Sequence, residues 1–92
     1  MRFEGKVFRD GRFWLAEIPL LAAMTQGRTR TEALAMIADW LETMVNRADF
    51  RAEVHHHGQA EFEVSGNDVP AMTALLLRRR REARRRLPVV IS

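Results

Sequence analysis

The sequence predicts a small α+β domain in which a mainly antiparallel sheet packs against one amphipathic helix, followed by a basic C-terminal helix (β-β-β-α-β-β-α). Two segments, 2–7 and 60–65, alternate apolar and polar residues with the period of a half-buried strand. A third segment, 33–45, spaces its apolar residues with the period of a helix. The chain has 92 residues, of which 47% are hydrophobic, so it can build one core.

The first segment is expected to pair with the next one as a β-hairpin. Asp10 and Gly11 suit the two positive-φ positions of a type I′ turn. The predicted cross-strand pairs are Arg9 with Arg12, Phe8 with Phe13, and Val7 with Trp14.

This register gives the hairpin two different faces. The core face carries Val7, Trp14, Ala16 and Ile18, and the other face carries Phe8, Phe13 and Leu15. The second face is too apolar for water, so another element or another copy of the protein should cover it. The same register sets Glu4 against Glu17, a like-charge pair that favours a bulge or a slipped turn.

Pro19 should end the second strand, because it lacks a backbone donor, and 20–26 should return as a short third strand. A helix is expected to begin close to Thr29, which lies three residues before Glu32 in the spacing of a capping box. The apolar stripe of this helix comprises Ala33, Leu34, Ile37, Trp40, Leu41, Met44 and Val45.

The second half of the chain predicts another hairpin and another helix. Segments 51–56 and 60–65 are β-prone, and 66–68 form a loop before Pro70, which suits a first helical turn. Ala71, Met72, Leu75 and Leu76 give this helix its apolar face, Pro88 should end it, and 89–91 form an apolar end that could add a strand across a dimer. We divide the chain into a core, 1–68, and a C-terminal arginine-rich helix and tail, 69–92.

The net charge of +3 conceals an acidic body and a basic tail. Residues 78–86 hold seven arginines and one acid, whereas 1–77 hold 8 basic and 11 acidic residues. An acidic body favours a basic partner, and an arginine block favours phosphate groups. The chain has no cysteine and no apolar run long enough to span a membrane, so we expect a cytoplasmic protein without membrane contact.

The residues give little support to catalysis or metal binding. His55 and His57 project to one face of a strand, but two ligands are not a site, and a third would have to come from Glu53 or Glu61. The strand residues Glu61 and Glu63 should point to water, and so do not converge on paired metal ions. We therefore expect no enzymatic activity, no metal and no cofactor.

The order of Phe13–Pro19 (FWLAEIP), Thr25–Thr29 (TQGRT) and Thr31–Leu34 (TEAL) resembles the core of the HicB family of antitoxins. The match runs from about Val7 to Trp40, and more loosely over residues 1 to 86. The resemblance implies a partial, inactive ribonuclease H-like fold. It also implies an antitoxin of a type II toxin-antitoxin system, which docks on a small basic ribonuclease toxin and inhibits it.

The chain departs from the family after Pro88, where relatives continue into a helix-turn-helix or ribbon-helix-helix segment. We therefore expect no complete DNA-binding domain, which leaves sequence-specific binding open. The alternative function is an orphan regulatory or nucleic-acid-binding module that acts through its arginine-rich helix on DNA or RNA without sequence preference.

Two sets of site residues follow from this reading. For the toxin contact, or for self-association into a dimer or larger homo-oligomer, we expect Phe8, Phe13, Leu15 and Glu17, with Trp14 placed equally well in the core. For nucleic acid we expect Arg78, Arg79, Arg80, Arg81, Arg84, Arg85 and Arg86.

Overall fold

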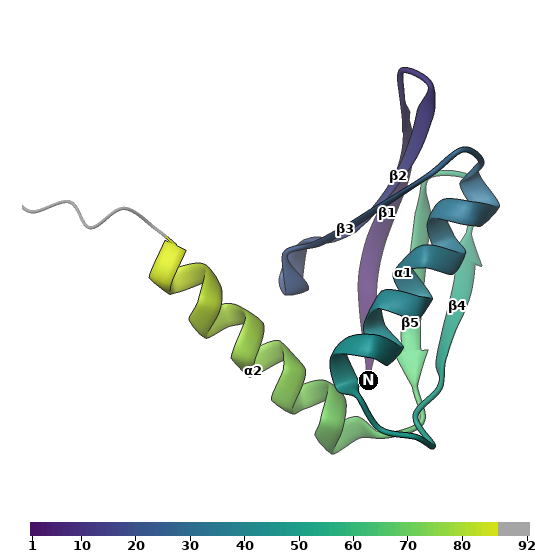
Figure 1. Cartoon of the computed structure of the whole chain (residues 1–92). Helices are drawn as coiled ribbons and strands as arrows, with labels where there is room; N and C mark the ends of the chain where they lie inside the picture. Colours follow the sequence, from purple (N-terminus) through teal and green to yellow (C-terminus); the bar gives the residue numbers. More distant parts are fainter. Residues whose placement is uncertain (87–92) are drawn as a thin grey trace, which may run out of the picture.

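The computed structural model describes residues 1–86 as a five-stranded antiparallel sheet with two α-helices (Figure 1). The predicted α+β class and element order are confirmed. The elements are β1 (Arg2–Asp10), β2 (Phe13–Ile18), a 3-10 turn η1 (Pro19–Leu21), β3 (Ala23–Gly27), α1 (Arg30–Val45), β4 (Ala52–His57), β5 (Glu61–Gly66) and α2 (Val69–Arg86). The strands lie in the order β3-β2-β1-β5-β4. The predictions for Pro88 and 89–91 lie outside the described residues.

The hairpin of β1 and β2 has a different register from the predicted one. Its turn is Gly11-Arg12, with a positive φ only at Gly11, and Asp10 pairs with Phe13. The predicted Asp10-Gly11 turn and its pairs are therefore wrong. The observed register places Lys6, instead of Glu4, opposite Glu17, so a pair of opposite charges replaces the like-charge pair.

The predicted faces of the hairpin survive this shift, because the register moves by two residues and side chains alternate with a period of two. Val7 now pairs with Ala16, and both are buried. Phe8 pairs with Leu15 on the opposite face.

Helix α1 begins and packs as its sequence predicts. The Thr29 hydroxyl accepts a hydrogen bond from the Glu32 amide at 3.0 Å, and Asn46 ends the helix in the left-handed conformation. The members of the predicted stripe are either buried or packed against the core. This stripe covers one face of the sheet.

The second hairpin and α2 complete the same core. Phe62 and Val64 of β5 are buried, as the alternation predicts. The Asp68 carboxylate caps α2 by accepting from the Ala71 amide at 3.0 Å. Met72 of α2 joins the core of the sheet, whereas the last turns of the helix extend away from the body (Figure 1).

No helix that the structure describes is both long and apolar enough to cross a membrane.

The core side chains of the strands and helices form one cluster, which lies on a single face of the sheet. The opposite face, hereafter the open face, is covered by no described element. The open face is therefore the large surface on which the fold can present a binding site.

Candidate functional site

One end of the open face is apolar. Phe8 and Leu15 are cross-strand partners, and Phe13 lies two residues from Leu15 toward the hairpin tip. Met24 follows on β3, opposite Glu17. Phe8 and Phe13 are each 39% exposed and Met24 is 54% exposed. These four side chains, Phe8, Phe13, Leu15 and Met24, form the apolar patch.

Glutamates from three neighbouring strands adjoin the apolar patch. Lys6 of β1 lies between Glu17 of β2 and Glu61 of β5, its two cross-strand partners. Glu4 and Glu63 face each other two pairs further along the same two strands, β1 and β5. Glu4, Glu17, Glu61 and Glu63 form the glutamate cluster. Strand pairing thus brings together acids that are far apart in the sequence. Glu4 and Glu63, for example, are 59 positions apart.

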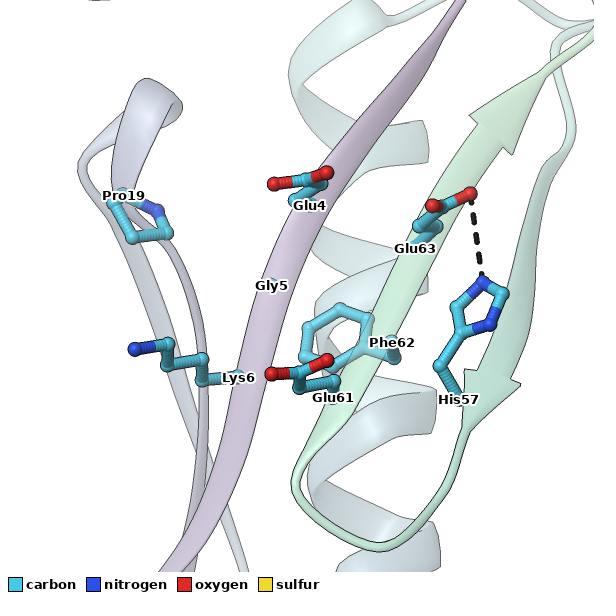
Figure 2. Close-up of a pocket in the computed structure, with 8 residues that line it drawn as sticks. All are labelled: Glu4, Gly5, Lys6, Pro19, His57, Glu61, Phe62 and Glu63. Carbon is cyan, nitrogen blue, oxygen red and sulfur yellow. Dashed lines mark ion pairs between the residues drawn. The ribbon is translucent and has the colours of Figure 1, made fainter.

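The open face is hollowed beside this cluster (Figure 2). The hollow has a volume of about 350 Å³. Figure 2 shows the carboxylates of Glu4 and Glu61 flanking it, with Pro19 and Lys6 at its other side. Its lining comprises Glu4, Gly5, Lys6, Pro19, His57, Glu61, Phe62 and Glu63. The hollow is open to solvent and can receive a polar or basic side chain of a partner.

Among the described residues, Glu63 of the glutamate cluster is contacted by Arg2 and by the ring of His57. The hydrogen bond from Arg2, at 3.2 Å, lowers the pKa of Glu63, and the nearby His57 ring at 3.6 Å acts in the same direction, against desolvation. Because folding lowers this pKa, the charged Glu63 stabilises the protein above the ordinary carboxyl pKa. That contribution is lost as the pH falls through the lowered pKa.

The three histidines do not act as one group. His55 contacts the Ser65 hydroxyl at 2.7 Å and His57 faces Glu63, both on the open face. His56 lies on the other face, where its ring is 3.1 Å from the Arg30 guanidinium. Within the part of the chain that the structure describes, no three His, Cys, Asp or Glu side chains are arranged to hold a metal ion.

The predicted interface residues separate into two groups. Phe8, Phe13, Leu15 and Glu17 lie together on the open face. Trp14 instead lies on the helix-covered face, half-buried and packed against the core, so we remove it from the interface set. Sequence reasoning missed Met24. The alternation of buried and exposed positions along β3 could have placed this residue on the open face.

The arginines of α2 also separate. Arg79 is only 14% exposed at its side chain. Its guanidinium donates to the carbonyls of Leu21 at 2.7 Å and Ala22 at 3.0 Å, and lies over the Trp40 ring. Arg79 therefore fastens α2 to η1, which corrects its assignment to nucleic acid. The sequence could have indicated this inward position, because Arg79 lies on the same helical stripe as Met72.

Arg78 donates to the Met44 carbonyl at 3.1 Å and remains partly exposed. Arg80, Arg81 and Arg84 are exposed. The side chains of Arg85 and Arg86, in the last turn of α2, lie outside the described part.

Comparison of the chain with protein-family models, with curated proteins and with solved structures finds no match.

Proposed function

We propose that this protein is an antitoxin-like binding module that docks through its open face on a small basic ribonuclease toxin and inhibits it. The observation that carries the proposal is the joining of the apolar patch to the glutamate cluster on a sheet face that no described element covers. The resemblance of Phe13–Pro19 to the HicB family supplies the kind of partner.

The apolar patch supports a protein partner. Large apolar side chains gathered on one exposed face are typical of interaction sites, and aromatic side chains supply much of the energy of such contacts. Phe8 and Phe13 project from the hairpin beside Leu15, so a partner can bury all three without any change in the sheet.

The charge of the open face supports a basic partner. Six acids and two bases project from it, which leaves a net charge of −4 with the histidines neutral. Complementary charge accelerates association and disfavours acidic partners. The acids are Glu4, Asp10, Glu17, Glu53, Glu61 and Glu63, and the bases are Arg2 and Lys6.

Size-exclusion chromatography with light scattering tests this function, on the chain alone and on the chain mixed with the product of the adjacent small reading frame. We expect a stoichiometric complex and loss of ribonuclease activity in it. The Phe13→Asp variant should weaken the complex while its melting temperature stays within a few degrees of wild type, because Phe13 is exposed.

The control is Leu20→Asp, at an exposed apolar residue on η1 that lies outside the apolar patch. It should leave the complex intact. No complex with the wild-type chain would refute the function, and a large drop in the melting temperature of Phe13→Asp with an intact complex would refute the assignment of the open face.

The exposure of Arg80, Arg81 and Arg84 favours a second candidate function, non-specific binding of DNA or RNA. Three phosphate contacts predict that the logarithm of the binding constant falls with the logarithm of salt concentration with a slope of about −3. Fluorescence anisotropy with a labelled oligonucleotide measures this slope. A binding constant unaffected by salt would refute the phosphate contacts.

A further inference from the structure

The outer side of α2 combines one apolar residue with three cations. Leu77, Arg80, Arg81 and Arg84 follow the spacing i, i+3, i+4 and i+7, which places them on one side of a helix. They line a shallow groove of about 230 Å³, and Leu77 is 53% exposed. We refer to these four residues as the arginine face.

The cations of the arginine face have no acidic partner within the described part of their own chain. The single acid of α2, Glu82, lies 3.9 Å from Arg78 and 2.9 Å from Arg79 instead. Helix α2 packs on the helix-covered side of the sheet, and its distal end is directed away from it (Figure 1). The arginine face therefore cannot reach the glutamate cluster of the same molecule.

The open face complements the arginine face in both charge and apolar pattern. On the helix, Leu77 is flanked by arginines. On the sheet, Glu17 lies beside both Met24 and Leu15. Glu61 lies in the same cross-strand row as Met24 and Glu17, two strands beyond Glu17. An exposed leucine among the cations gains nothing from phosphate groups, whereas an apolar protein surface buries it.

The length of the arginine face also agrees with the length of the matching row on the open face. Leu77 to Arg84 spans about 10 Å along a helix at 1.5 Å per residue. The cross-strand row from Met24 through Glu17 and Lys6 to Glu61 spans about 14 Å at the usual spacing between strands. A helix crossing the strands can thus set Leu77 near Met24 and its arginines near Glu17 and Glu61.

We propose that the arginine face of one molecule docks on the open face of a second copy of this chain. The contact goes beyond the proposed function and does not depend on it. Because it joins two different surfaces, it closes as a reciprocal pair or ring, or else continues as a chain of molecules. The same glutamates would then serve either a second copy or a basic partner, and the two would compete.

Charge reversal tests the proposal by light scattering after size exclusion, at about 50 mM and about 500 mM salt, across which exposed ion pairs become screened. The wild-type chain should self-associate at low salt and dissociate at high salt. The helix variant carries Arg80→Glu, Arg81→Glu and Arg84→Glu, and the face variant carries Glu17→Lys and Glu61→Lys. Each should weaken self-association by about tenfold or more.

Mixing the two variants provides the decisive measurement. Each alone sets like charges against each other, whereas the mixture pairs opposite charges and should assemble again at low salt. The control variant carries the same change in net charge as the helix variant but at exposed positions outside α2, and should self-associate like wild type. Its substitutions are Arg9→Glu, Arg12→Glu and Arg28→Glu.

Glutamine at the same three helix positions and at the same two sheet positions provides a milder set, and circular dichroism confirms that each variant is folded. A monomeric wild-type chain at low salt would overturn the proposal, as would variants that still self-associate or a mixture that stays monomeric. Self-association that disappears after nuclease treatment would also overturn it and assign the arginines to nucleic acid. None of these measurements involves a toxin, so their failure leaves the proposed function untouched.

Discussion

Replacing Arg79 with alanine should destabilise the protein far more than the same replacement at its neighbour Arg80. Arg79 is largely enclosed and bonds the carbonyls of Leu21 and Ala22, whereas Arg80 is exposed. The carbonyls belong to the end of η1 and the residue that follows it, so the side chain joins α2 to the corner between β2 and β3.

The structure sets the size of the effect. A hydrogen bond from a charged donor contributes about 1.5 kcal/mol at the lower end of its range. The guanidinium also lies 5.4 Å from the centre of the Trp40 ring, a contact that contributes about 1 kcal/mol when partly exposed. Because a water molecule can replace part of these contacts, we expect Arg79→Ala to lower the free energy of unfolding by about 3 kcal/mol.

Chemical denaturation followed by tryptophan fluorescence measures this loss, and thermal unfolding should show a drop of roughly 10 to 25 °C for a domain of this size. Arg79→Lys should recover only a small part, because an ammonium group cannot span two carbonyls and stack on a ring. Arg80→Ala should stay within about 0.5 kcal/mol of wild type. Equal stabilities of the Arg79→Ala and Arg80→Ala variants would refute the fastening role.

Three further substitutions test other parts of the structure. Thr29→Ala removes the cap of α1 and should cost about 1 kcal/mol in chemical denaturation, whereas Thr29→Ser should cost little; equal losses would argue against the cap. Gly5→Ala places a methyl group against the Phe62 ring and should lower the free energy of unfolding by about 2 kcal/mol. Thermal unfolding would detect this loss, and an unchanged melting temperature would contradict it. Arg2→Ala should raise the pKa of Glu63, measured by carbon NMR of the carboxyl group, and reduce the stability lost on acidification; an unchanged pKa would mean that Arg2 does not hold this carboxylate.

The local elements could be predicted because their signals are local. The Thr29 cap and the apolar stripe of α1 depend on residues within a few positions of each other. The face of each hairpin residue follows from strict alternation, which is why Phe8 and Phe13 were placed correctly although their pairing was not. Alternation defines which face of a strand each residue occupies. It does not define the register, because registers that differ by two residues give the same faces.

The functional surface could be predicted only in part. The apolar hairpin face was evident from the sequence, but the glutamate cluster was not, because Glu4, Glu17 and Glu61 meet only after β5 inserts beside β1. Likewise, the seven arginines among the nine residues 78–86 indicate a basic helix, but they do not show which arginine side chain turns inward.

Periodicity, capping and charge are properties of neighbouring residues. The amino-acid pattern alone therefore predicts the element types, the two faces of each strand, and the division into an acidic body and a basic helix. The strand order β3-β2-β1-β5-β4, the hairpin register and the enclosed position of Arg79 become known only from the folded chain. These depend on contacts between segments far apart in the chain, where burial and the pairing of Lys6 with Glu17 choose among arrangements that local patterns leave equal.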